Sequence, residues 1–261
     1  MKYLGGKHGI GKLIAEFLSN QCPPNTVSGY IEPFCGSLGV FKNMTTLGYK
    51  SYIASDIQPD LIEMWKQVQQ NTFKIPNHIS EKEYNKLKNA KSPNALKAAA
   101  GFGLSFGGKY FAGYAQKWAG NSGRNFLEEF KTSIKKIQPL ITNNNIKFLN
   151  KSFTDFKPNN MLIYCDPPYK FTQGYSTGEF NHDEFWELMR KWSKHNCVFI
   201  SEESAPKDFN VIWKRKKRRT LDKQNRFNSY EKIYQYSGTP KFIKTKKNKN
   251  IGNKTRKIKK N

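Results

Sequence analysis

The stretch from Met161 to Tyr169, Met-Leu-Ile-Tyr-Cys-Asp-Pro-Pro-Tyr, constrains the fold more than any other part of this chain. Its first half is a short apolar run, typical of a strand that is buried on both faces. Prolines cannot continue a central strand, so we expect the strand to end at Asp166. Ligands of open α/β sheets bind at the carboxyl ends of the strands. The stretch therefore predicts an acid, a rigid turn and an aromatic ring at an active site, with an ordinary strand and turn as the alternative.

A second strand followed by a glycine-containing loop lies earlier in the chain. Gly29-Tyr30-Ile31 leads into the segment 32–41, Glu-Pro-Phe-Cys-Gly-Ser-Leu-Gly-Val-Phe. Glycines at such a junction let the backbone approach a nucleotide-like ligand, and N–H groups at the helix start can bind its polar atoms. The next predicted strand ends at Asp56, about 20 residues later, where an acid can accept hydrogen bonds from ribose hydroxyls. A helix cap before Pro59 is the other interpretation of Asp56, and both can hold at once.

Alternating strands and helices predict an α/β fold with a mostly parallel sheet. Apolar residues at helical spacing predict helices over 9–20, 126–140 and 181–195, with the second ending near Pro139. Further strands are predicted at 146–149 and 197–200, and a hairpin over 209–214 and 230–236. The segment 2–7, with two glycines and two lysines, is either a flexible terminus or a place where a lysine pairs with a carboxylate or phosphate.

Residues 58–120 interrupt the alternation and are predicted to form a helical insertion between two parts of the sheet. They include a polar linker at 71–80 and a helix from Asn94. The loop 106–118 interleaves glycines, aromatic residues and lysines. Such a loop can lay rings and cations along a nucleic-acid strand, or it can be a packed aromatic hairpin.

The charge of the chain favours a polyanionic partner. Lys and Arg number 45 against 20 Asp and Glu, a net charge of +25. Nucleic acid is the partner that we favour, and an anionic membrane surface competes with it. Six consecutive cations at 214–219 indicate a phosphate-contacting edge, a nuclear-targeting cluster or a solvated basic edge. The tail 241–261 has ten Lys or Arg and no acid, so we expect it to be disordered.

Cysteine and histidine spacing gives no indication of a metal site. Cys22, Cys35, Cys165 and Cys197 are widely separated and are expected to be reduced core residues. No apolar run reaches about 18 residues, and no signal-peptide pattern follows Met1. We therefore expect a soluble intracellular protein, in the cytoplasm of a bacterium or of an infected host cell, with a nuclear location as an alternative.

The order of these motifs resembles that of the Dam-like family of DNA adenine N6-methyltransferases. Lys-x-x-Gly-Gly-Lys comes first, then Glu-Pro-Phe-x-Gly, the strand ending at Asp56, the insertion, and Asp-Pro-Pro-Tyr. The resemblance covers roughly residues 1 to 236. It implies a Rossmann-like class I S-adenosylmethionine-dependent core at 1–57 and 121–238, a target-recognition insertion at 58–120, and a basic tail at 239–261.

The resemblance also implies roles for individual residues. The catalytic motif matches Asp166, Pro167, Pro168 and Tyr169. Positions that contact S-adenosylmethionine match Tyr3, Lys7, Glu32, Phe34, Gly36, Asp56, Ser152, Phe153 and Asp166. We expect contacts with double-stranded DNA from Lys109, Tyr110, Lys117, Arg124, Lys216 and Arg218. One departure concerns the loop: the family often has a second glycine where Leu38 stands, and here the glycine follows at Gly39.

The implied reaction is direct transfer of a methyl group to adenine N6 after the base is flipped from the duplex. Asp166 and the Pro167 carbonyl would accept the two amino hydrogens, and Tyr169 would stack on the base. Two alternatives stay open: a methyltransferase acting on RNA adenine or on cytosine N4, and a catalytically silent DNA-binding relative. We expect a monomer or weak dimer without metal; a partner restriction enzyme, as in restriction-modification systems, and the target sequence are open.

Overall fold

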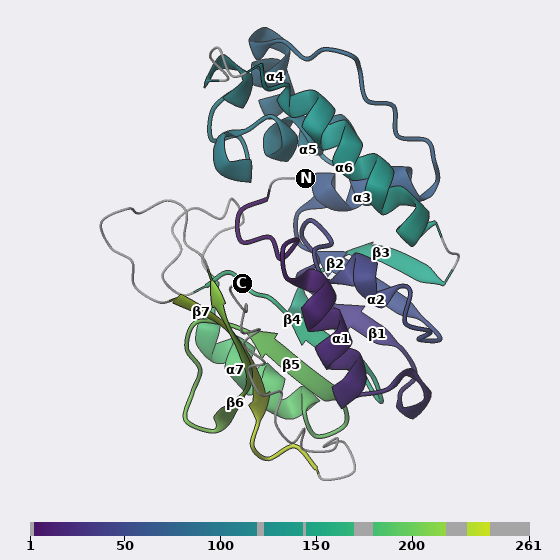
Figure 1. Ribbon diagram of the computed structural model, residues 1–261, viewed down its shortest axis with the longest axis vertical. Helices are drawn as coiled ribbons and strands as arrows, with labels where there is room; N and C mark the ends of the chain where they lie inside the picture. Colours follow the sequence, from purple (N-terminus) through teal and green to yellow (C-terminus); the bar gives the residue numbers. More distant parts are fainter. Residues whose placement is uncertain (1–2, 119–122, 143–144, 170–179, 218–228, 241–261) are drawn as a thin grey trace, which may run out of the picture.

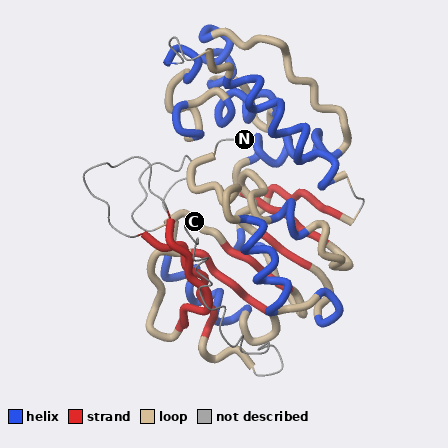
Figure 2. The backbone as a smooth tube through the Cα atoms, viewed as in Figure 1, coloured by secondary structure: helices blue, strands red, loops and turns tan. Residues whose placement is uncertain are grey.

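The computed structural model describes residues 3–118, 123–142, 145–169, 180–217 and 229–240. Its centre is a seven-stranded sheet of order β3-β2-β1-β4-β5-β7-β6 (Figures 1 and 2). The strands are β1 (Tyr30–Glu32), β2 (Tyr52–Asp56), β3 (Ile146–Asn150), β4 (Leu162–Cys165), β5 (Cys197–Ser201), β6 (Phe209–Lys217) and β7 (Ser229–Tyr236). Strands β1 to β5 pair in parallel, and β7 and β6 add an antiparallel edge. The predicted Rossmann-like α/β fold is confirmed.

Alternate residues of the central strands face two separate apolar cores. In β4, Leu162 and Tyr164 lie in one core, while Ile163 and Cys165 lie in the other. The same alternation divides Phe199 from Ile200 in β5. Side chains of a strand point to opposite faces in turn, so a strand without polar residues must be covered on both sides. This is why the apolar run before Asp166 has no polar member.

Helices cover both faces of the sheet (Figure 1). The larger core receives buried residues from α1 (Gly11–Gln21), α2 (Phe41–Met44), α3 (Pro59–Gln69) and α6 (Phe126–Ile141). The opposite core is formed with α7 (His182–Trp192), which contributes Phe185, Trp186, Met189 and Trp192. No helix in the described ranges has the length and hydropathy needed to cross a bilayer.

A third apolar cluster lies in the lobe that contains α4 (Glu81–Lys88) and α5 (Ala95–Ala98) (Figure 1). Its buried members are Ile79, Tyr84, Ala100, Leu104 and Leu127. Helix α6 joins this lobe to the sheet, because Leu127 belongs to the third cluster while later residues of α6 belong to the larger core. The division of the chain into core and insertion stays a prediction.

Two helices differ from the expectation. Helix α6 ends at Ile141, one residue beyond the predicted range, so Pro139 lies inside its last turn. A proline removes one hydrogen bond from the preceding turn, which is tolerated this near a helix end. Helix α4 was not predicted, because Tyr84 is its single buried residue and it has no apolar stripe. Its sequence signal is the capping box formed by Ser80 and Glu83.

The expectation of four reduced cysteines was wrong for one pair. Cys22, after α1, and Cys197, at the start of β5, form a disulfide, whereas Cys35 and Cys165 are free and buried. The two bonded cysteines are 175 residues apart in sequence, so no spacing rule brings them together. Among the described residues, no group of three or more His, Cys, Asp or Glu side chains is placed to bind a metal ion.

Asp60 ties the first turn of α3 to the lobe beyond it. Its buried carboxylate accepts hydrogen bonds from the Asn94 N–H at 2.7 Å, the Ser92 hydroxyl at 3.0 Å and the Tyr110 hydroxyl at 2.7 Å. The Lys97 ammonium lies 3.9 Å away. A buried carboxylate is stable only when its oxygens are satisfied in this way. The contacts fix the loop before α5 and the segment around Tyr110 against the start of α3.

Replacing Asp60 by Ala should lower the free energy of unfolding by about 2–4 kcal/mol, because it leaves several buried donors without an acceptor. Asp60→Asn keeps one acceptor oxygen and should cost less. Urea unfolding of both variants tests this, with the exposed Glu16→Ala on α1 as control. An Asp60→Ala protein as stable as the control would show that the lobe is held by its apolar contacts alone.

Candidate functional site

Four of the parallel strands deliver an acid to the same edge of the sheet. β1 and β2 end with Glu32 and Asp56, Asp166 follows β4, and Glu202 follows β5. The carboxyl ends of parallel strands meet at one edge, so these side chains gather there. β1 and β4 are neighbours although far apart in the chain, so the strand order reverses between them. Sheets of this kind form their ligand crevice at such a reversal.

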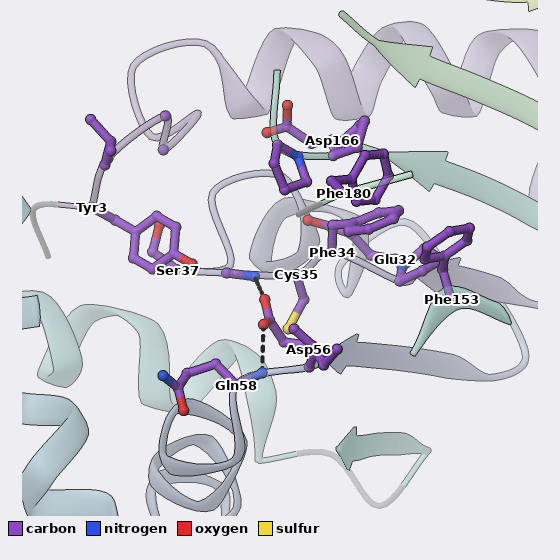
Figure 3. Close-up of a pocket in the computed structure, with 18 of the residues that line it drawn as sticks. Tyr3, Glu32, Phe34, Cys35, Ser37, Asp56, Gln58, Phe153, Asp166 and Phe180 are labelled. Atoms are coloured by element: carbon purple, nitrogen blue, oxygen red, sulfur yellow. Dashed lines mark hydrogen bonds between the residues drawn. The ribbon is translucent and has the colours of Figure 1, made fainter. Parts of the chain in front are cut away.

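A cavity of about 710 Å³ opens at this edge (Figure 3). The volume lies within the usual range of ligand sites. Its walls include every residue expected at the cofactor or in catalysis, namely Tyr3, Lys7, Glu32, Phe34, Gly36, Asp56, Ser152, Phe153, Asp166, Pro167, Pro168 and Tyr169. Motifs that are distant in sequence thus surround one hollow, and their individual roles stay predictions.

The loop after β1 is shaped by close backbone contacts. Gly36 has a positive φ of 44°, and a β-carbon there would lie 2.9 Å from the Tyr3 ring. Its carbonyl accepts a hydrogen bond from the Trp65 indole at 2.9 Å. A side chain at this position would both strain the backbone and displace Tyr3. Gly36 therefore lets residue 3 reach the cavity wall.

The loop has Leu38 where the family often has a second glycine, and the structure explains this difference. Leu38 itself adopts a positive φ of 59°, and its side chain is fully buried in the larger core. The glycine that follows is needed for packing, because a β-carbon on Gly39 would lie 2.9 Å from the backbone nitrogen of Lys7. The shifted glycine therefore lets the segment that carries Lys7 pass directly over the loop.

Asp56 holds the loop and the start of α3 together. Its carboxylate accepts the Gly36 N–H and the Gln58 N–H, each at 3.0 Å (Figure 3). Burial raises the pKa of Asp56, and hydrogen bonds from backbone N–H groups, which favour the charged form, oppose that shift. The N-cap residue of α3 is Gln58 and not Asp56. Asp56 thus braces the turn next to the cap, and it also lines the cavity.

Lys7 lies at the centre of a buried polar cluster. Its ammonium is 2.7 Å from the Asp166 carboxylate and 2.9 Å from the Tyr169 hydroxyl, and the side chain is 6% exposed. Burial alone would lower the pKa of Lys7, but the ion pairs with Asp166 and Glu231 outweigh burial and raise it. One interpretation of the segment 2–7 was that a lysine pairs with a carboxylate. Lys7 forms such a pair, and its partner Asp166 belongs to the Asp-Pro-Pro-Tyr motif.

Glu231 of β7 completes the cluster and was not predicted. It lies 3.4 Å from the Lys7 ammonium, and its Oε1 accepts hydrogen bonds from the hydroxyls of Tyr169 at 3.0 Å and Ser201 at 2.6 Å. A single acid within a strand belongs to no local sequence motif. The one sequence signal was its inward position in the pattern of the predicted strand, two residues before the buried Ile233.

Two further carboxyl groups at this edge have raised pKa values. Burial raises the pKa of Glu32 well above its ordinary range; a hydrogen bond from the Tyr30 hydroxyl opposes this shift, and the charge of Asp166 adds to it. Burial also raises the pKa of Glu202 to about 7. One oxygen of Glu202 accepts the Glu203 N–H at 2.9 Å, and the other is buried without a hydrogen-bond partner among the described residues.

Aromatic rings form one wall of the cavity. Phe34 and Phe153 have their centroids 5.3 Å apart, and Phe180 lies 5.8 Å and 5.5 Å from them (Figure 3). Phe153 is held in a short 3-10 turn that is capped by Ser152 and Asp155. Phe180 was not predicted, because it precedes the N-cap of α7 and belongs to no motif. Rings in such tilted arrangements form a wall suited to a flat apolar ligand.

The residues expected to bind DNA have diverse surroundings. Lys109 and Tyr110 line the cavity, but Tyr110 also packs on Phe102 at 4.7 Å, so the packed arrangement holds for this ring. Arg124 forms two hydrogen bonds of 2.8 Å with Glu129. Lys216 is exposed on the edge strand β6. Arg218 and the side chain of Lys117 lie outside the described residues. Phe106, in the same loop as Lys109, is 64% exposed.

Comparison with known proteins finds a family similarity in the amino-terminal part of the chain. Residues 3–97 match the family model of D12 class N6 adenine-specific DNA methyltransferases, which confirms the predicted resemblance over this segment and supports methyltransferase activity. No curated protein matches the sequence.

Solved structures with similar folds have low sequence identity. The yhhF protein of Escherichia coli, named as a candidate methyltransferase, is 10% identical, with a TM-score of 0.40 and 88% of each chain covered. A candidate methylase of Haemophilus influenzae is 13% identical, with a TM-score of 0.36 and coverage of 87% of this chain and 98% of that one. Because these TM-scores are low, the assignment of the fold class rests on the strand order described above.

Glu202→Gln should stabilise the protein at alkaline pH. The pKa of the Glu202 carboxyl is about 7 in the folded protein, against an ordinary value of 4.5. Between these two pH values the native state binds a proton that the unfolded state does not bind. The charged form therefore lowers stability above pH 7, and this loss disappears below the ordinary value. Glutamine stays neutral, so the gain in unfolding free energy should be about 1–3 kcal/mol at pH 8 and much smaller at pH 5.

Urea unfolding of the Glu202→Gln variant and the wild-type protein at the two pH values measures the effect. The exposed Glu187→Gln on α7 provides the matched control. A gain that is equal at both pH values would mean that the Glu202 carboxyl does not titrate in this range.

Proposed function

We propose that this chain transfers the methyl group of S-adenosylmethionine to the N6 amino group of adenine in double-stranded DNA. The observation that carries the proposal is the position of the Asp166–Tyr169 motif. It follows the central strand β4 and lines the same cavity as the loop after β1 and Asp56. The family match over residues 3–97 supports the same reaction.

The residues of the cavity fit this cofactor. Carboxyl groups at the strand ends suit its sulfonium and ammonium cations, and Asp56 ends the strand from which an acid can bind ribose hydroxyls. Phe34, Phe153 and Ile57, which is 53% exposed at the cavity wall, offer apolar surface to a purine ring. When bound, S-adenosylmethionine supplies an electrophilic methyl group on its sulfonium.

Asp166 and Pro167 prepare the nucleophile in this proposal. The lone pair of adenine N6 is delocalised into the ring, so the amino group is a poor nucleophile. Accepting one amino hydrogen at the Asp166 carboxylate and one at the Pro167 carbonyl favours a pyramidal nitrogen with its lone pair available. Pro167 and Pro168 fix the backbone of the turn, so both acceptors are in place before the base arrives.

Lys7 and Tyr169 keep that geometry. The Lys7 ammonium, 2.7 Å from Oδ1 of Asp166, limits rotation of the carboxylate. The same ammonium binds the Tyr169 hydroxyl, so the aromatic ring has a fixed orientation. A fixed ring can stack on an extruded base and offset part of the few kcal/mol that flipping requires. Proximity of the amino nitrogen to the methyl group then provides much of the acceleration.

DNA binding in this proposal depends on charge outside the cavity. The chain carries 45 Lys and Arg, and β6 presents exposed Lys214, Arg215 and Lys216 along the edge of the sheet. Contacts to phosphates give affinity without sequence preference. The segment 58–120 is proposed to read the target sequence, and its Lys109 lines the cavity.

Asp166→Ala should abolish methyl transfer, by at least about 1,000-fold, because it removes an acceptor for the amino hydrogens. The variant should fold, since Lys7 keeps Glu231 at 3.4 Å. Transfer of labelled methyl from S-adenosylmethionine to unmethylated plasmid DNA measures activity, and a gel-shift assay measures DNA binding. Asp166→Asn keeps the shape and is the matched control for charge. Retained methylation by Asp166→Ala would refute the role given to Asp166.

Nucleoside mass spectrometry of the labelled nucleic acid tests the acceptor. N6-methyladenine in DNA supports the proposal, whereas N4-methylcytosine or label in RNA assigns another acceptor with the same kind of amino group. Cofactor binding without any transfer would favour the catalytically silent relative.

Lys216→Ala should weaken DNA binding similarly for all sequences and reduce the dependence of log affinity on log salt by about one. The matched control is Lys12→Ala, an exposed lysine on α1 that is not among the predicted DNA contacts. Fluorescence anisotropy with a labelled duplex at several salt concentrations measures both quantities. An unchanged salt slope would place β6 away from the DNA.

A further inference from the structure

Glu231 is a charged residue in an inward-facing position of β7. Its side chain is 1% exposed, and Ile233, two residues along β7, lies in the larger core. A carboxylate in such a position is strongly unfavourable unless it is paired and hydrogen bonded. Ile233 shows that an apolar side chain can fill this face of the strand, so packing alone does not explain an acid at position 231.

Two partners of Glu231, Lys7 and Tyr169, connect it to the Asp-Pro-Pro-Tyr motif. Its Oε1 is 3.4 Å from the Lys7 ammonium, which is itself 2.7 Å from Asp166. The same oxygen accepts the Tyr169 hydroxyl at 3.0 Å, and that hydroxyl accepts a hydrogen bond from Lys7 at 2.9 Å. Two carboxylates from different strands thus hold one ammonium, and one of them also holds the aromatic residue of the motif.

We propose that Glu231 is a positioning residue for methyl transfer, which acts by fixing the Lys7 ammonium against Asp166 and the Tyr169 ring at the base-binding position. This inference rests on the proposed function. Ser201 at the end of β5 donates a hydrogen bond to Glu231 at 2.6 Å and so fixes the carboxylate in turn. The antiparallel edge of the sheet thereby supports a site that is formed mainly by the parallel strands.

Charge and hydrogen bonding make separable contributions to this role. The negative charge of Glu231 favours the charged form of Lys7 in a buried place, together with Asp166. The hydrogen bond to the Tyr169 hydroxyl fixes the ring and does not need a full charge. Glu231→Gln removes the charge and keeps the size and an acceptor oxygen, whereas Tyr169→Phe removes the hydroxyl and keeps the ring.

Steady-state methylation by Glu231→Gln tests the charge. We expect kcat to fall roughly 10- to 100-fold, with KM for S-adenosylmethionine changed by less than about threefold, because geometry at the motif is lost and cofactor contacts are not. The alkaline limb of the kcat profile should move to lower pH, since Lys7 loses its proton more readily without the second carboxylate. Glu187→Gln, exposed on α7, is the control.

Tyr169→Phe tests the hydrogen bond. If Glu231 acts partly through the hydroxyl, the double variant should lose less activity than the product of the two single losses, a departure from additivity that marks contacting residues. Thermal unfolding and circular dichroism of each variant establish that it is folded. Additive effects of the two substitutions would overturn the route through Tyr169.

Titration of the Lys7 ammonium by NMR with labelled lysine gives a readout that needs no activity. A lower Lys7 pKa in Glu231→Gln than in the wild-type protein supports the proposal. An unchanged titration, or a loss of kcat with an unmoved alkaline limb, would overturn it. If the wild-type protein transfers no methyl group to DNA or RNA, the proposed function fails instead, and the NMR titration still decides whether Glu231 sets the charge of Lys7.

Discussion

The buried ammonium of Lys7 is the interaction on which the cavity edge depends. A lone charge at 6% exposure would be strongly destabilising, so the buried Lys7 ammonium must be paired with a carboxylate. Two carboxylates lie within reach, Asp166 after β4 and Glu231 in β7. The described residues 3–10, which contain no helix or strand, are thereby held over the loop after β1, where Gly39 leaves room for their backbone.

Sheet topology explains why so few residues are enough to form the site. Parallel strands with buried faces place whatever follows them at one edge, and here Glu32, Asp56, Asp166 and Glu202 follow or end four such strands. The reversal of strand order between β1 and β4 keeps helices from closing that edge. Local turns then determine which groups face the cavity. Prolines fix the turn after Asp166, and Gly36 lets Tyr3 reach the cavity wall.

Much of the sheet and of the cavity could be predicted because its signals are local. Apolar runs that stop at a proline or glycine mark strand ends, and acids at those ends mark the edge at which they meet. Glu231, Phe180 and the disulfide between Cys22 and Cys197 could not be predicted, because each depends on a pairing between distant segments. Tyr110 could not be assigned from sequence either. The loop around it has the composition of a nucleic-acid contact, but its ring packs on Phe102 and its hydroxyl donates a hydrogen bond to Asp60.

The place of β7 in the chain has a consequence for biosynthesis. Proteins are made from the amino terminus, and segments of a domain become available for folding in that order. Lys7, the loop after β1 and the Asp166 turn all leave the ribosome before Glu231, which lies in the last described strand. A product truncated before β7 would therefore retain every motif that identifies the chain in a sequence search, yet it would lack the second carboxylate that holds Lys7.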